Sequence, residues 1–217
     1  MTNIEVLSRV LKCGVVAVVR SPDSSKLVQV AEALAAGGVE VLEITFTIPN
    51  ALKVIEQVAD KLGGKVLLGA GTVLDAATAR SAILAGAEYV VSPVVKLEVI
   101  EMCKRYSRLA MPGAFTPTEI LTAWEAGADV VKVFPSEVLG PSYLKAVKAP
   151  LPQVRLMPTG GVTLDTAKDF LAAGACALGI GGSLVSAKAI QTNDYAGIES
   201  LARQFVKIVD DFRAAAK

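Results

Sequence analysis

Trp124-Glu125-Ala126-Gly127-Ala128-Asp129 combines the end of an Ala-rich helix, a glycine suited to a left-handed cap, and the start of an apolar strand. The same pattern occurs in residues 34–39, 84–88 and 171–176. The four glycines, at positions 37, 86, 127 and 174, are 49, 41 and 47 residues apart. Because one strand and its helix need about 20 to 30 residues, each interval is expected to hold two such units.

Apolar runs suited to the remaining strands lie where this spacing requires them. Strands alternating with helices, without a break in composition, predict one domain over residues 1–217, a single (βα)8 TIM barrel. An open doubly wound sheet is the alternative. Residues 4–13 are expected to form a helix that covers the barrel bottom, and residues 195–216 an amphipathic closing helix. The eight expected strands cover residues 15–20, 39–46, 66–70, 88–92, 109–111, 129–134, 154–158 and 176–180.

The composition excludes several classes of function. Hydrophobic residues make up 53% of the 217 residues, which suits buried parallel strands and Ala-rich helices. The net charge is +1 without a long run of either sign, which argues against nucleic acid or a membrane surface as the main partner. The chain has no histidine, so His-based triads are excluded and the commonest metal ligand is missing.

The three cysteines and the N-terminus indicate a reducing compartment. Cys13, Cys103 and Cys176 are far apart and form no CxxC pair, so neither a disulfide framework nor a zinc site is indicated. No apolar run reaches about 18 residues, and the first residues lack a signal-peptide pattern. We therefore expect a cytoplasmic protein.

A lysine occupies the middle of the sixth expected strand, Asp129-Val130-Val131-Lys132-Val133-Phe134. Alternation places Val130, Lys132 and Phe134 on one face of the strand. A charge in such a position destabilises the fold unless it is paired, neutralised or used. For an isolated lysine, the simplest structural interpretation is a side chain that extends its ammonium group to water.

Glu43 is the other charge within a strand, on the face that it shares with Thr45 and Thr47. If both side chains face the interior, Glu43 meets Lys132. A buried ion pair is the structural alternative, but apolar packing stabilises a fold better. Burial instead favours a neutral Lys132 amine that attacks a carbonyl to form an imine, while Glu43 moves protons. This pair predicts cleavage of a carbon–carbon bond next to a ketone, without a metal or cofactor.

Two glycine-rich turns follow the last two expected strands, Thr159-Gly160-Gly161 and Gly181-Gly182-Ser183. Glycine leaves its backbone N–H group accessible, and such groups, together with the N-terminus of a following helix, bind phosphate. TIM barrels usually place a phosphate after strands seven and eight. Either turn alone is weak evidence for a phosphate site, since glycine also closes tight turns. Together they predict a phosphate site.

In combination, these motifs resemble those of the class I aldolases that act on 2-keto-3-deoxy-6-phosphogluconate (KDPG) and 4-hydroxy-2-oxoglutarate (KHG). The resemblance covers nearly the whole chain. It rests on VVAVVR (15–20), LEITFT (42–47) with PNA (49–51), GAGTV (69–73), VSP (91–93), MPGAFTPTE (111–119), KVFPSE (132–137), PTGGV (158–162) and GIGGS (179–183).

The resemblance implies a homotrimeric (βα)8 enzyme in which Lys132 forms a Schiff base with pyruvate and Glu43 is the acid/base. Some members carry an arginine in the loop after strand two, where this chain has Thr47. Arg20 is then the nearest partner for the pyruvate carboxylate, and both residues are expected to bind substrate. The other implied substrate-binding residues are Thr72, Pro93, Phe134, Thr159, Gly160, Gly161, Gly181, Gly182 and Ser183.

The expected partners are pyruvate and a phosphorylated keto acid, and the expected reaction is reversible cleavage of KDPG to pyruvate and glyceraldehyde 3-phosphate. The enzyme is also expected to cleave KHG to pyruvate and glyoxylate. The alternatives are an aldolase for the galactonate epimer of KDPG, a phosphosugar isomerase or epimerase on the same barrel, and a barrel that binds phosphometabolites without turnover.

Overall fold

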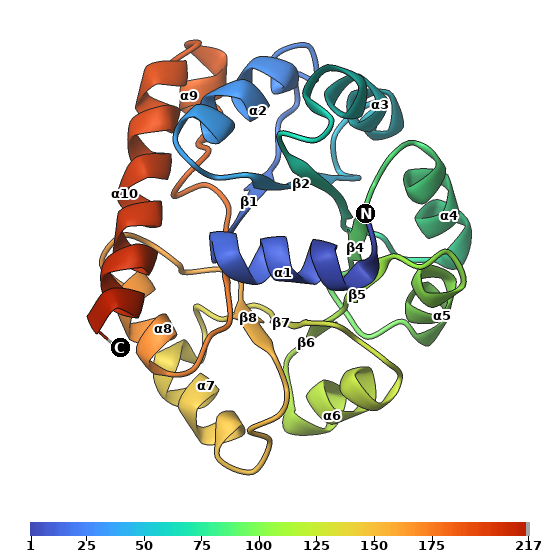
Figure 1. Ribbon diagram of the computed structural model, residues 1–217, viewed down its shortest axis with the longest axis vertical. Helices are drawn as coiled ribbons and strands as arrows, with labels where there is room; N and C mark the ends of the chain where they lie inside the picture. The colour runs from blue at the N-terminus through green and yellow to red at the C-terminus, as the bar shows by residue number, and fades with distance from the viewer. Residues whose placement is uncertain (216–217) are drawn as a thin grey trace.

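Each apolar strand run is followed by a helix that returns the chain to the same end of the sheet, so all pairs of neighbouring strands are parallel. The computed structural model describes residues 1–215 and shows curled parallel sheets inside a layer of helices (Figure 1). Six strands form one sheet, in the order β5 (Leu109–Met111), β4 (Tyr89–Val91), β3 (Leu67–Gly71), β2 (Val41–Thr45), β1 (Val15–Val19), β9 (Leu178–Ile180). The second sheet contains β6 (Gly113–Ala114), β7 (Val131–Val133) and β8 (Leu156–Pro158).

The helices lie around the outside of the strands rather than on two faces of an open sheet, so the doubly wound alternative is not observed (Figure 1). They are α2 (Leu27–Ala36), α3 (Ala51–Leu62), α4 (Ala76–Leu84), α5 (Leu97–Arg105), α6 (Pro117–Glu125), α7 (Gly140–Lys148), α8 (Ala167–Ala172), α9 (Ala187–Gln191) and α10 (Tyr195–Ala215). The predicted closing helix is confirmed for residues 195–215, and Ala216 lies outside the described residues. Within residues 1–215, no helix combines the length and apolar character needed to cross a bilayer.

Glycine caps follow the prediction at three of the four positions. Gly86, Gly127 and Gly174 have φ values of 111°, 97° and 98°, in the left-handed region. Gly37 was predicted wrongly, because it stays right-handed with a φ of −80° while Gly38 takes the positive value of 89°. A methyl group at Gly37 would overlap α10, so this glycine serves close helix packing instead.

The fifth strand is divided in two, whereas the sequence predicted a single strand over residues 109–111. Pro112 has no N–H to donate, and it separates β5, which pairs with β4, from β6, which pairs with β7. The Lys132 N–H nevertheless donates to the Pro112 carbonyl at 2.9 Å. On the other side, parallel bridges join Leu156 to Ala175 and Thr159 to Gly179. The two sheets are therefore in contact at both of these places.

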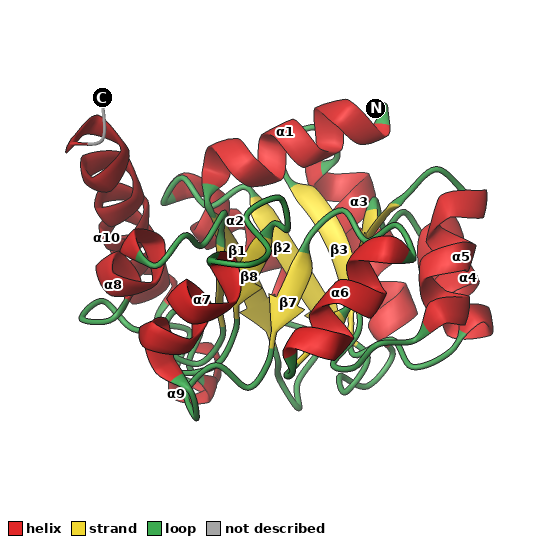
Figure 2. Cartoon of the chain, turned by 90° about the horizontal axis from the view of Figure 1, so that it is seen from below, coloured by secondary structure: helices red, strands yellow, loops and turns green. Residues whose placement is uncertain are grey.

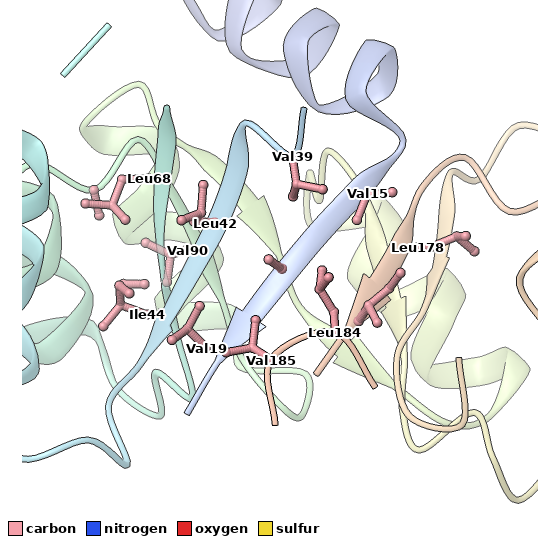
Figure 3. Packing of buried hydrophobic residues seen from close by; sticks show 14 of the residues in the cluster. Val15, Val19, Val39, Leu42, Ile44, Leu68, Val90, Leu178, Leu184 and Val185 are labelled. Atoms are coloured by element: carbon pink, nitrogen blue, oxygen red, sulfur yellow. The ribbon is translucent and has the colours of Figure 1, made fainter. Parts of the chain in front are cut away.

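Side-chain alternation divides the apolar residues into two cores. Val15, Leu42, Ile44 and Leu178 belong to the outer core, which packs against the helices (Figure 3). The inner core lies on the opposite strand faces and contains Val16, Val41, Leu67, Tyr89, Val91, Leu109, Met111, Val130, Met157 and Ala177. This division confirms the predicted faces of the second and sixth expected strands.

Helix α1 (Asn3–Cys13) covers the ends at which the strands begin, as predicted for residues 4–13 (Figure 2). Thr2 and Glu5 form a capping box that starts the helix. Val6 and Val10 are 1% and 0% exposed, and they pack into the inner core. The interior therefore opens at the other end, where the strands finish.

Candidate functional site

The two charged side chains singled out in the sequence both lie inside the molecule. Lys132, in the middle of β7, is 2% exposed, and Glu43, in the middle of β2, is 0% exposed. Their sequence neighbours Val131, Val133 and Ile44 belong to the outer core, so Lys132 and Glu43 point to the interior.

These two interior charges do not form the buried ion pair that was the structural alternative. Within residues 1–215, no ion pair joins Lys132 to Glu43, and both carboxylate oxygens of Glu43 lack a hydrogen-bond partner. An unpaired buried carboxylate costs stability, and such costs are typical of functional sites.

Phe134 contacts the amine of Lys132 and also lines a cavity at the strand ends. The Nζ atom of Lys132 lies 4.9 Å from the centroid of the Phe134 ring. That ring lines a cavity of about 620 Å³, together with Val18 at the end of β1. Val18 pairs with Glu43 in the sheet, so Glu43 lies on the strand next to one that contributes to the cavity wall.

The cavity gathers eight of the predicted site residues at the carboxyl ends of the strands, where α/β folds of this kind place their ligands. They are Arg20, Phe134, Thr159, Gly160, Gly161, Gly181, Gly182 and Ser183. Arg20 is the only basic side chain among the described residues of its wall. A larger open groove, of about 770 Å³, lies at the opposite strand ends beside Arg9, Glu40 and Lys65, and it contains neither Glu43 nor Lys132.

The two glycine turns have the expected open backbone but not the expected helices. Gly160 and Gly161 are left-handed, and a side chain at Gly161 would meet Glu137 at 2.6 Å, so only glycine fits. No described atom lies within 4 Å of the position that a Gly182 side chain would take. However, α8 and α9 begin only at residues 167 and 187, so neither turn leads directly into a helix. Any anion there would be held by backbone and side-chain groups of the turns.

Thr72 and Pro93 lie beside the charged residues rather than on the cavity wall. Thr72 follows β3 with a φ of 59°, a left-handed conformation that costs about 1–3 kcal/mol in a residue other than glycine. The carbonyl of Pro93 fills the space beside Gly113, and Gly113 pairs with Lys132. Thr47 is exposed and is not part of the cavity wall, and its hydroxyl lies 2.8 Å from that of Thr45.

Gly71 fixes where the Glu43 carboxylate can lie. The carboxylate occupies the space that a side chain at Gly71 would need. If Glu43 is the acid/base that the resemblance implies, Gly71→Ala should reduce kcat for KDPG cleavage by about 100-fold, because a displacement of about 1 Å at a catalytic group costs this much. Activity should be measured beside the thermal midpoint of unfolding.

The control for this substitution is the double variant with Glu43→Ala. If the alanine at position 71 acts by displacing Glu43, it should have no further effect once that carboxylate is gone. Additive losses in the double variant, or full activity of Gly71→Ala alone, would contradict the assigned contact.

The cavity also contains residues that were not predicted. Glu137 lies within the KVFPSE motif but was not among the predicted site residues, although an acidic residue shortly after the end of a strand is a usable signal. Val18, Val162, Val185 and Ala187 are apolar wall residues without any such signal. Within residues 1–215, no three His, Cys, Asp or Glu side chains gather as a metal site requires.

Comparisons with known proteins identify the family of this chain. A family model described as "KDPG and KHG aldolase" matches residues 6–201. A 2-dehydro-3-deoxy-phosphogluconate aldolase of Treponema pallidum is 37% identical over 96% of this chain and 98% of its own length. A 2-dehydro-3-deoxy-6-phosphogalactonate aldolase of Escherichia coli K12 is 32% identical over 94% of this chain and 97% of its own.

A solved structure shares the fold as well. The KDPG aldolase of Legionella pneumophila, with pyruvate captured as a covalent carbinolamine intermediate, superposes with a TM-score of 0.84 and 28% identity. The match covers 91% of this chain and 96% of that one. The family inferred from the sequence motifs is thereby confirmed, and the chain belongs to the KDPG and KHG aldolase family, whose members are carbon–carbon lyases.

Proposed function

We propose that this protein is a class I aldolase that cleaves KDPG reversibly to pyruvate and glyceraldehyde 3-phosphate. The observation that carries the proposal is that Lys132 and Glu43 are both buried in the interior without forming an ion pair within residues 1–215. Phe134, whose ring contacts the lysine amine, lines the strand-end cavity. An amine in such surroundings is suited to nucleophilic attack on a keto group, and an unpaired carboxylate is suited to proton transfer.

In the proposed reaction, Nζ of Lys132 attacks the C2 keto carbon, and loss of water gives an imine. The C4 hydroxyl proton passes to Glu43 while the C3–C4 bond breaks and its electron pair moves into the imine. This releases glyceraldehyde 3-phosphate and leaves an enamine. Glu43 then returns a proton to C3, and water hydrolyses the resulting imine to free pyruvate and the Lys132 amine.

The cavity wall suits the phosphorylated end of this substrate. Arg20, the glycine turns and Ser183 line one cavity, and the Thr159 hydroxyl is buried there without a partner among the described residues. We assign the phosphate to the turns and Arg20 to an anionic end of the substrate, with Thr72 and Pro93 bordering the pyruvate portion. Thr47 keeps the weakest support, because it lies off the cavity wall.

We further propose that the strands close into one eight-stranded barrel and that residues 1–217 form a single catalytic domain. The contacts of β8 with β9, and of the segment around Pro112 with its neighbours on both sides, support closure. Homotrimeric assembly and a cytoplasmic location remain predictions from the resemblance and the sequence. Light scattering of the purified protein measures the number of subunits.

The activity is tested by adding borohydride together with pyruvate. Reduction should trap one pyruvate on the peptide that carries Lys132, and peptide mass spectrometry should locate it there. Borohydride without pyruvate is the control. Absence of an adduct together with interconversion of phosphosugars would support the isomerase or epimerase alternative, and phosphosugar binding without turnover would support a binding protein.

The galactonate epimer is a second candidate substrate, because one of the matching relatives carries that name. The two epimers differ at one hydroxyl, which a pocket discriminates only through local polar contacts. Comparing kcat/KM for both phosphorylated epimers and for KHG identifies the preferred substrate.

A further inference from the structure

The strands contain one more titratable side chain than the proposed mechanism uses. Among all strand residues within residues 1–215, only Glu43, Tyr89 and Lys132 are titratable. All three are buried, and Tyr89 belongs to the inner core. Glu43 and Lys132 have proposed roles, whereas Tyr89 has none.

The sheet register places Tyr89 beside Glu43. Glu43 on β2 pairs with Gly69 on β3, and Gly69 pairs with Tyr89 on β4. Because Gly69 has no side chain, the Tyr89 ring lies over it, with its hydroxyl-bearing carbon in the space of the missing Cβ. The ring therefore extends across β3 toward β2, and the Glu43 side chain extends over Gly71 on the same strand.

Both groups lack hydrogen-bond partners among the described residues. The Tyr89 hydroxyl and both oxygens of Glu43 are buried and unpartnered. Leaving such groups unpaired is costly, and a phenylalanine would fill the same space without that cost. A buried water with two or more polar partners satisfies a phenol and a carboxylate that do not touch directly.

The surroundings of Tyr89 keep its hydroxyl protonated, so that it can donate a hydrogen bond. Burial, and next the negative charge of Glu43, raise the pKa of Tyr89 well above its ordinary value, and Cys13 at the end of α1 contributes in the same direction. β1, β3, β5, β6, β8 and β9 bring no titratable residue to this interior, and β7 brings only Lys132. The phenol therefore keeps its proton throughout the range of an enzyme assay.

We propose that Tyr89 is a positioning residue whose hydroxyl donates, through one buried water, to the Glu43 carboxylate and holds it in position for proton transfer. The inference rests on the proposed function, because its kinetic consequences require that Glu43 is the acid/base. It assigns no contact between Tyr89 and the substrate.

Tyr89→Phe tests this inference with a nearly isosteric side chain. We expect kcat for KDPG cleavage to fall by about 10-fold to 100-fold, the range for a hydrogen bond to a charged group, with KM little changed. The rate at which pyruvate exchanges its methyl protons in D₂O should fall by a similar factor, because the same carboxylate carries out that proton transfer.

A purely structural role for Tyr89 gives the opposite result. Removing a hydroxyl without a partner would then raise the thermal midpoint and leave both kcat and the rate of methyl-proton exchange unchanged, and this outcome would overturn the inference. Tyr195→Phe is the matched control, since its hydroxyl bonds Asn193 at the surface, 3.3 Å away. In a Glu43→Gln background, Tyr89→Phe should not slow the remaining reaction further, whereas an added loss would contradict action through Glu43.

Trapping of pyruvate by the wild-type protein separates this inference from the proposed function. If the wild type forms the Lys132 adduct and Tyr89→Phe retains the wild-type rates of cleavage and of methyl-proton exchange, only the role of Tyr89 is wrong. If the wild type forms no adduct, the proposed function itself fails.

Discussion

Replacing Lys132 by methionine should lower the rate of KDPG cleavage by about 10⁴-fold or more, because the nucleophile that forms the covalent intermediate is removed. Methionine has a similar length and is accommodated by apolar surroundings. The variant should therefore remain folded, and the inner core around β7 should keep its packing. The measurements are a coupled assay for pyruvate release and the borohydride adduct on the intact protein.

Lys132→Arg is the matched variant for this prediction, since arginine retains a positive charge but does not form an imine. Both variants should be inactive if Lys132 is the nucleophile. If Lys132→Arg cleaves KDPG normally, the charge and not the imine is what the reaction needs. If the wild-type adduct maps to a different lysine, the site is assigned wrongly even though the reaction class holds.

Glu43→Gln should reduce kcat by about 10²- to 10⁴-fold, the usual contribution of a positioned acid/base group. Glutamine preserves the shape of the side chain but does not take up the C4 hydroxyl proton or exchange one at C3. Pyruvate incubated with the wild type in D₂O should exchange its methyl protons, as NMR measures directly. The variant should lose this exchange while Lys132 still forms a slow adduct.

The same substitution should increase stability. Glu43 is 0% exposed and forms no ion pair within residues 1–215, so replacing the charged group by a neutral amide removes the unfavourable burial of a charge. Lower activity with a higher thermal midpoint is the trade-off expected at a catalytic site. Unchanged methyl exchange in Glu43→Gln would instead show that another group acts as the base.

Much of the fold and two central site residues could be predicted from the sequence because strands have a period of two. That period correctly separates Lys132 from Val131 and Val133, and a charge in an apolar strand is rare enough to be noticed. The glycine turns after β8 and β9 could be located by spacing alone. The starts of the helices that follow these turns could not be located in this way, since the chain forms further turns before α8 and α9.

The missed features depend on relations between strands that the sequence does not display. Tyrosine is an ordinary strand residue, and the position of Tyr89 gains meaning only when its partner across the sheet is known to be Gly69. Pro112 was a visible signal that the fifth strand is divided. The sequence does not show, however, that β5 pairs with β4 and that β6 pairs with β7, because this pairing depends on how the two sheets lie against each other. Gly37 likewise required knowledge of α10 packing against it.

The helix across the strand beginnings has a consequence for the order of events in the proposed reaction. Val6 and Val10 fill that end, so we expect substrate to enter and both products to leave at the carboxyl ends of the strands. In the proposed reaction, pyruvate would be attached to the buried Lys132, while the phosphorylated fragment would lie at the glycine turns that line the cavity. The aldehyde would then leave first, and pyruvate, freed only after hydrolysis, would leave last.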